Sequence, residues 1–182
     1  MGWGVAYALL VALLLVRFRD PDVPVRATPR PEPGEPLRLV AVHHLVFYVL
    51  LVAAPVEAAV LGGATAGRWA GLAGFAFGVY LYRAGGRALG DALSPFVQPV
   101  RGAPLVHAGP FRLVRHPMYL GQALIALGAP LTLGAWRSLG LSLVAVAVLM
   151  IRGRREEAAL RRTFADYDAY ARRTKRFIPY VF

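Results

Sequence analysis

Long apolar stretches, each near the length of a bilayer-spanning helix, dominate this sequence. Hydrophobic residues make up 57% of its 182 residues and charged residues only 17%. That is more apolar surface than a soluble domain of this size could bury. Because about 20 helical residues cross the roughly 30 Å hydrocarbon core of a bilayer, we expect an all-α integral membrane protein.

Five stretches are candidate transmembrane helices: residues 1–16, 39–61, 69–82, 117–133 and 138–151. The first is short but lacks the charged n-region and the cleavage site of a signal peptide, so we interpret it as an uncleaved helix. The third and fifth are also short for a span. The last two are separated only by GAWR, which predicts a tight antiparallel helical hairpin.

Lysine and arginine are distributed unevenly between the loops. They gather in segments 17–38, 83–116 and 152–182, whereas the two opposite loops contain only Arg68 and Arg137. The positive-inside rule then predicts a multi-pass protein with these segments and the C-terminus in the cytoplasm and the N-terminus outside. The same rule accounts for the net charge of +11. No basic stretch lies in a soluble recognition module, so we expect no nucleic-acid partner.

The chain reads as a single membrane domain, 1–182, in two parts. Residues 1–84 would hold three spans and a proline-rich cytoplasmic connector at 20–36, a composition that forms no fold of its own. Residues 85–182 would hold the polar motifs and end in an amphipathic cytoplasmic helix. Its apolar face, on the membrane or on the other loops, would contain Leu160, Phe164, Tyr167 and Ala171. With no cysteine in the chain, disulfides and thiolate sites are excluded, and we expect no metal.

The densest polar cluster, GPFRLVRHPMYLG, stands at residues 109–121. Pro117 suits the first turn of a helix, which places His116 near the N-cap. The unpaired N–H groups and the positive dipole end there, beside Arg112 and Arg115, favour an anion. Arginines before a membrane helix also serve as interfacial anchors, and the spacing does not decide between these two roles.

A second polar cluster begins where the fifth apolar stretch ends. Arg152 and Glu156 are four residues apart and share a helix face, with Glu157 next in the sequence. A solvated, charge-paired helix has the same pattern. However, the hairpin brings residues 117 and 151 side by side, so an anion-binding helix start would face a carboxylate. That arrangement suits a zwitterionic ligand.

Together the two clusters resemble the integral-membrane methyltransferases typified by isoprenylcysteine carboxyl methyltransferase, with the phospholipid N-methyltransferases as relatives. The resemblance covers residues 85–180, and rests on the RHP-x-Y-x-G element, the acidic pair and an F-x-x-Y-x-x-Y-like tail. It implies that 85–182 form a methyltransferase-like catalytic part. It also implies S-adenosylmethionine as donor, S-adenosylhomocysteine as product, and a lipid or lipidated acceptor entering from the bilayer.

The resemblance also implies a set of site residues. Arg152 would contact the acceptor and share the catalytic role with Glu156. The donor contacts would be Gln98, Ala103, Pro104, Leu105, Val106, Phe111, His116, Pro117, Met118, Tyr119, Glu156 and Glu157. Of the two adjacent acids we expect Glu156 to matter more, because it stands four residues after Arg152.

The acceptor stays open between a carboxylate of the isoprenylcysteine type, which needs no base, and a phospholipid amine, which must first lose a proton. An NADPH-dependent membrane sterol or steroid reductase is a competing function, because such enzymes have a related C-terminal architecture. A non-enzymatic membrane scaffold is a third, but it leaves the two polar clusters unexplained.

Other residues of the apolar stretches have simpler interpretations. His43 and His44 begin the second stretch at the cytoplasmic interface, where we expect a structural role. Glu57 lies near its outer end, and we expect it to pair with Arg68 or Arg137. Gly74 and Gly78 have the small-xxx-small spacing of helix packing.

Overall fold

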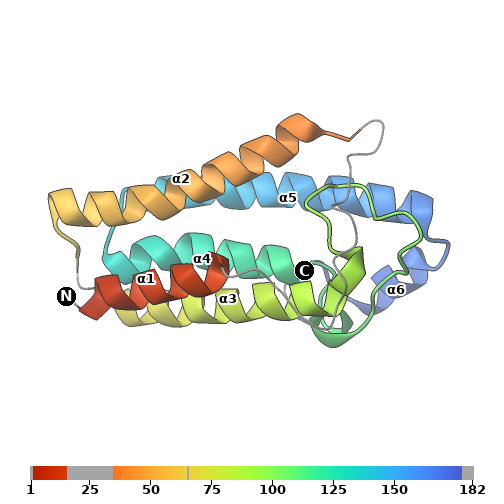
Figure 1. The fold of residues 1–182 in the computed structure, drawn as a ribbon, viewed down its shortest axis with the longest axis horizontal. Helices are drawn as coiled ribbons and strands as arrows, with labels where there is room; N and C mark the ends of the chain where they lie inside the picture. The colour runs from red at the N-terminus through yellow and green to blue at the C-terminus, as the bar shows by residue number, and fades with distance from the viewer. Residues whose placement is uncertain (1, 16–34, 65, 178–182) are drawn as a thin grey trace.

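The computed structural model describes residues 2–15, 35–64 and 66–177, and all regular elements within them are helical. Figure 1 shows long helices lying along the long axis of the molecule, with a short helix, α6, at one end. The helices are α1 (Gly2–Leu15), α2 (Leu37–Leu61), α3 (Arg68–Leu89), α4 (Pro117–Leu133), α5 (Ser138–Thr163) and α6 (Tyr167–Arg173), with 3₁₀ turns η1 (Gly90–Ala92) and η2 (Gly109–Arg112).

Each of the predicted apolar stretches forms a helix, but two helices run further than expected. α3 continues to Leu89, and α5 continues past residue 151 to Thr163. The prediction of one amphipathic helix with Leu160, Phe164, Tyr167 and Ala171 on its apolar face is wrong, because α5 ends at Thr163 and α6 begins only at Tyr167. The segment RGRREEAALRR is rich in strong helix formers, so α5 continues through it until Phe164 adopts an extended conformation.

Among the described helices, α2 is the one that is both long and apolar enough to cross a membrane, judged by length and composition. α1 and α4 are apolar but shorter. The structure thus supports one membrane-capable helix and two shorter apolar helices. The arrangement with five spans stays a prediction.

Glycines allow a close approach between α3 and α4. A Cβ at Gly78 would lie 2.6 Å from the carbonyl oxygen of Gly121, and a Cβ at Gly128 would lie 2.6 Å from the backbone nitrogen of Phe75. The expectation that Gly78 packs against another helix is confirmed. The expectation for Gly74 is wrong, because a Cβ there would meet no atom within 4 Å.

The hairpin between α4 and α5 forms at the GAWR sequence as predicted. Gly134 ends α4 with φ 75°, a left-handed conformation that favours glycine. Its N–H donates to the carbonyl of Leu131 at 3.2 Å, and the next N–H, of Ala135, donates to Pro130 at 2.8 Å. This cap turns the chain back so that α5 runs antiparallel to α4.

Glu57 near the end of α2 caps the start of α5. Its carboxylate accepts hydrogen bonds from the backbone N–H groups of Arg137 and Ser138, at 2.8 Å each, and from the Ser138 hydroxyl at 2.7 Å. The expected pairing with Arg137 therefore uses its backbone N–H and not its guanidinium. Arg137 precedes the first turn of α5, and the positive end of a helix dipole attracts a carboxylate. Of the two expected partners Arg137 is therefore the one found, and the Arg68 guanidinium instead donates to carbonyls of the preceding loop.

The structure bears on two points of the predicted division into residues 1–84 and 85–182. The connector expected at 20–36 lies almost wholly outside the described residues, as do the last residues of the resemblance, 178–180. The boundary expected between residues 84 and 85 falls inside α3, which lies beside α4 (Figure 1). One continuous helix thus belongs to both parts.

Candidate active site

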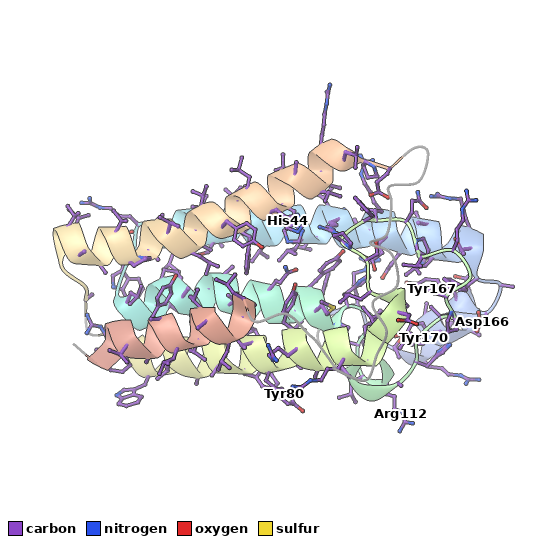
Figure 2. All side chains as sticks on the ribbon, viewed as in Figure 1. His44, Tyr80, Arg112, Asp166, Tyr167 and Tyr170 are labelled. Carbon is purple, nitrogen blue, oxygen red and sulfur yellow. The ribbon has the colours of Figure 1, made fainter. Side chains whose placement is uncertain are left out.

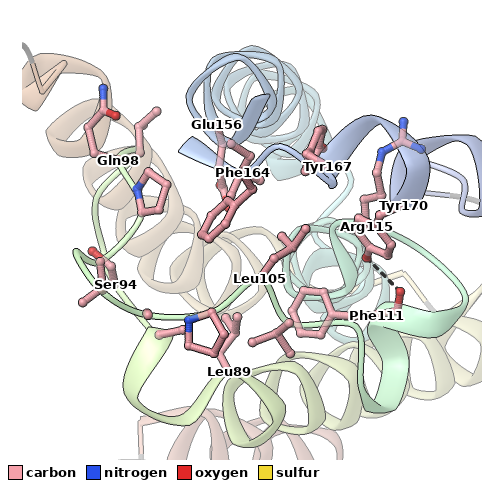
Figure 3. Close-up of a pocket in the computed structure, with 18 of the residues that line it drawn as sticks. Leu89, Ser94, Gln98, Leu105, Phe111, Arg115, Glu156, Phe164, Tyr167 and Tyr170 are labelled. Atoms are coloured by element: carbon pink, nitrogen blue, oxygen red, sulfur yellow. Dashed lines mark hydrogen bonds between the residues drawn. The ribbon is translucent and has the colours of Figure 1, made fainter. Parts of the chain in front are cut away.

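A pocket opens at the end of the bundle where α3 ends and α6 lies (Figure 3). Its walls come from the loop after η1, from η2, from the last turns of α5 and from α6. Including the part open to solvent, it spans about 690 Å³. In Figure 3, Leu105, Phe111 and Phe164 point into the space, with Gln98 and Glu156 at its edge.

The predicted donor contacts separate into two groups. One group lines the pocket: Gln98, Ala103, Pro104, Leu105, Val106, Phe111 and Glu156. In the part of the chain that the structure describes, a second group lies outside the lining: His116, Pro117, Met118, Tyr119 and Glu157. Arg152, the predicted acceptor contact, also lies outside it. The contacts of the second group show how these residues bear on the pocket.

The loop that carries Gln98 is held by a carboxylate that sequence analysis missed. Glu35, just before α2, accepts hydrogen bonds from the backbone N–H groups of Val97 at 2.8 Å and Gln98 at 3.0 Å. Val97 is itself buried. Glu35 stands in a proline-rich segment with no periodic pattern, so nothing in the sequence pointed to this role.

The opposite wall is aromatic. Phe164, Tyr167 and Tyr170 line it together with Leu160, and Figure 2 shows both tyrosines at the α6 end of the molecule. Three of the four residues expected on the apolar face, Leu160, Phe164 and Tyr167, therefore face the pocket. The Tyr170 hydroxyl donates to the carbonyl oxygen of Phe111 at 2.8 Å (Figure 3, dashed line). Burial raises the pKa of Tyr170 to about 12, so the hydroxyl stays a donor at neutral pH.

Glu156 contributes a carboxylate to the pocket, and Tyr119 of α4 orients it. The Tyr119 hydroxyl donates to Glu156 Oε2, while the face of the same ring lies 5.7 Å from the Arg152 guanidinium carbon. The shared helix face of Arg152 and Glu156 therefore brings both to one aromatic ring. Tyr119 does not line the pocket itself but acts on it by orienting Glu156.

Arg152 is buried, with 3% of its surface exposed. Its guanidinium donates to His43 Nδ1 on α2 and to the carbonyl oxygen of Pro95. Pro95 lies between Ser94 and Phe96, which both line the pocket. Arg152 thus holds the pocket loop from behind and ties it to α2.

Glu157 lies in a buried ionic cluster beside the pocket. It is 1% exposed, and its oxygens lie 3.0 Å from Arg115 Nε, 2.6 Å from Arg176 Nη2 and 3.3 Å from His116 Nε2. Burial raises the pKa of Glu157, but His116, Arg176 and Arg115 outweigh burial and hold the pKa well below its ordinary range. These contacts direct Glu157 into the protein and away from the pocket, whereas its neighbour Glu156 faces it.

The start of α4, expected to be an anion site, is covered by residues 174–177. The N–H groups of Arg115 and His116 donate to the carbonyls of Lys175 at 2.8 Å and Arg176 at 3.1 Å. A neutral carbonyl oxygen therefore pairs with the N–H of the N-cap residue, His116, and another pairs with the N–H just before it. The His116 ring stacks on Tyr119, with centroids 5.3 Å apart, which supports the tyrosine that orients Glu156.

Comparisons with known proteins find one family and one relative. Residues 66–167 match the family model described as phospholipid methyltransferase, a range that includes α3, α4, α5 and the loop that lines the pocket. The chain is also similar to the nickel-cobalt-cadmium resistance protein NccN of Alcaligenes xylosoxydans xylosoxydans, with 35% identity over 89 residues. That match covers 46% of this chain and 40% of NccN, so less than half of the relative is represented. Among the described residues, no group of three or more histidine or acidic side chains could hold a metal ion.

Proposed function

Because the chain belongs to the phospholipid methyltransferase family, we propose that it transfers a methyl group from S-adenosylmethionine to a lipophilic acceptor at the membrane–cytosol interface. The observation that carries this proposal is the pocket that joins one carboxylate, Glu156, to a wall of aromatic rings. A donor with an ammonium group, a sulfonium and an adenine ring needs these two kinds of surface.

The residues of the pocket fit that donor. Glu156 would bind the ammonium group, and the faces of Phe111 and Phe164 suit the adenine and the sulfonium. The Tyr167 hydroxyl is buried without a hydrogen-bond partner among the described residues. Since an unsatisfied buried hydroxyl is unfavourable, a polar group of a bound ligand is its natural partner.

S-Adenosylmethionine supplies a methyl group on a positively charged sulfur, which is activated for transfer. The protein then has to align the acceptor and exclude water. Arg152, fixed by Pro95 and His43, would hold an anionic group of the acceptor. Tyr119 contacts both Arg152 and Glu156, and so keeps the acceptor side and the donor side in contact.

The membrane arrangement is part of the proposal. With five membrane helices, and with the basic segments and the C-terminus in the cytoplasm, the pocket would open to the compartment that contains the soluble donor. Arg152 would lie where α5 leaves the apolar region, within reach of a lipid or lipidated acceptor. An isoprenylcysteine-type carboxylate and a phospholipid amine both meet this description.

Calorimetric titration of the detergent-purified protein tests the donor. We expect binding of S-adenosylmethionine and S-adenosylhomocysteine and negligible binding of NADPH. Tight binding of NADPH without any response to the sulfonium would favour a reductase, and binding of none of these ligands would favour a scaffold. Incubation with labelled S-adenosylmethionine and a total lipid extract, followed by identification of the labelled product, would then name the acceptor.

A further inference from the structure

Glu35 contacts the pocket loop from outside the range that matches the family model. It stands two residues before the first residue of α2. Its Oε1 accepts a hydrogen bond from the backbone N–H of Val97 at 2.8 Å, and its Oε2 accepts one from that of Gln98 at 3.0 Å. Residues 94 and 96–100 line the pocket. One carboxylate therefore holds the middle of a pocket wall.

This loop has little backbone hydrogen bonding of its own. Within the described parts of the chain, no backbone N–H from residue 94 to residue 102 donates to a backbone carbonyl. The N–H of Phe96 donates to the Ser94 hydroxyl at 3.1 Å, and the next two N–H groups along the chain are those bound by Glu35. A loop without a backbone ladder depends on side-chain contacts for its shape. The two charge-assisted bonds to Glu35 are strong contacts of this kind.

The carboxylate of Glu35 is directed at the loop and not at the helix that follows it. An acid just before a helix commonly bonds to the free N–H groups of the first turn. Here the N-cap residue of α2 is Pro36, without a side-chain cap hydrogen bond, and both Glu35 oxygens bond to the loop. Since α2 is long and apolar enough to cross a membrane, Glu35 connects that helix to the pocket.

We propose that Glu35 is a positioning residue of the donor site, which holds the pocket loop in its ligand-binding conformation and so makes donor affinity depend on the start of α2. This rests on the proposed function, because the donor is the ligand concerned. If only a fraction of the molecules has a competent loop, the apparent affinity falls by that fraction. A saturating ligand restores the competent loop, so the loss of Glu35 would change KM for the donor and not kcat.

The other end of α2 offers a matched control. Glu57 is half-buried, as Glu35 is, and its carboxylate also accepts hydrogen bonds from two consecutive backbone N–H groups, those of Arg137 and Ser138, at 2.8 Å each. These two residues stand at the start of α5 and do not line the pocket. Glu35→Gln and Glu57→Gln therefore weaken the same kind of contact at opposite ends of one helix.

Two measurements on the detergent-purified full chain test the proposal: calorimetric titration with S-adenosylhomocysteine, and hydrogen exchange of residues 94–102 followed by mass spectrometry. We expect Glu35→Gln to weaken binding roughly three- to tenfold, because glutamine retains one acceptor oxygen and turns an N–H donor towards the other backbone N–H. Without ligand, the loop should exchange faster in Glu35→Gln than in the wild type, and saturating S-adenosylhomocysteine should remove the difference. Glu57→Gln should lower the melting temperature and change neither donor affinity nor loop exchange.

Turnover distinguishes positioning from a general loss of folded protein. It is measured with labelled S-adenosylmethionine and a total lipid extract as acceptor. Glu35→Gln should raise KM for the donor by the factor found in calorimetry and leave kcat at saturating donor nearly unchanged. A variant that only contains fewer folded molecules would lose kcat at an unchanged KM, and this result would contradict the proposal.

A folded Glu35→Gln variant that binds S-adenosylhomocysteine as tightly as the wild type would overturn the proposal. So would equal losses of affinity in Glu35→Gln and Glu57→Gln. If Glu35→Gln does not fold, Glu35→Asp takes its place, since it retains the charge and shortens the reach by one methylene group. If the wild type binds neither donor nor product, the proposed function fails. Loop exchange in the variants then decides whether Glu35 positions the loop, and unchanged exchange would overturn that as well.

Discussion

Glu156 and Glu157 are adjacent on α5 and face opposite environments. Glu156 lines the pocket and accepts a hydrogen bond from Tyr119. Glu157 is 1% exposed and lies between Arg115 and Arg176. With 3.6 residues per turn, neighbouring side chains on a helix point about 100° apart. Of two consecutive acids, one can therefore face a ligand site while the other is buried in the protein interior.

The first prediction separates these two roles. Glu156→Gln should weaken S-adenosylmethionine binding by about 1–3 kcal/mol, the value for a charge-assisted contact, with little change in melting temperature. Glu157→Gln should instead reduce the stability of the fold by about 3–5 kcal/mol, because it leaves buried positive groups unpaired. Calorimetry and thermal melting on both variants measure the two effects. Equal losses of donor affinity in two folded variants would place both acids in the donor site.

The second prediction concerns the stability of the fold at low pH. The folded-state pKa of Glu157 lies below that of the unfolded chain, so its stabilisation is complete above about pH 4.3, the ordinary glutamate value. As pH falls below that value, the unfolded state binds the proton first, and the stabilisation is lost until pH reaches the folded pKa. Melting temperatures between pH 7 and pH 3 should therefore fall more steeply for the wild type than for Glu157→Gln. Parallel curves would contradict this account.

The third prediction concerns Arg152. Lysine retains the charge but lacks the planar fork that lets one side chain reach both His43 and Pro95. Arg152→Lys should lower methyl transfer roughly tenfold or more, through misalignment of the acceptor, while donor affinity changes little. Arg152→Ala should lower it further. Turnover and donor affinity are measured on both variants, with Arg154→Lys, at an exposed position two residues further along the same helix, as the control.

Two outcomes would revise the role of Arg152. Full activity of Arg152→Lys would make the residue an interfacial anchor, which lysine can replace. Loss of donor affinity in a folded variant would place Arg152 in the donor site.

The fourth prediction concerns the contact between α3 and α4. Gly78→Ala places a methyl group 2.6 Å from the Gly121 carbonyl, and such overpacking should cost about 1–3 kcal/mol of stability. Gly74→Ala is the matched control on the same helix, because its Cβ meets no atom within 4 Å. It should be neutral or stabilising by up to about 1 kcal/mol, because alanine is the better helix former. Thermal melting in one detergent compares the two, and equal effects would contradict the close packing.

The helices of the fold were largely predictable because their signals are local. Pro117 begins α4 and Gly134 ends it, as the sequence predicts. The end of α5 was not predictable from hydropathy, since a helix can continue through a charged segment when other elements cover one face. Here Tyr167, from beyond the end of α5, has its ring centroid 5.5 Å from the guanidinium carbon of Arg161 on that helix.

Half of the candidate site was accessible from sequence and half was not. The loop with Gln98 and the acid Glu156 came from a family resemblance, and both line the pocket. His43 and Glu35 reach the site through contacts more than 60 residues away in the sequence, and no spacing rule connects such positions. The helix start at His116 was read as unpaired, because a sequence does not show that residues 174–177 cover it.

α5 is continuous from Ser138 to Thr163, so on the proposed function one helix would contact both a membrane-borne acceptor and a water-soluble donor. Arg152 and Glu156 lie on the same rigid rod, separated by about 6 Å along its axis, since each helical residue rises 1.5 Å. An acceptor diffusing in the plane of the bilayer arrives at a depth set by the lipid, whereas a soluble donor has no preferred depth of its own. On the proposed function, α5 holds the donor at a fixed height above the acceptor. A single residue inserted between Arg152 and Glu156 would therefore rotate Glu156 out of the pocket, even if every side chain were retained.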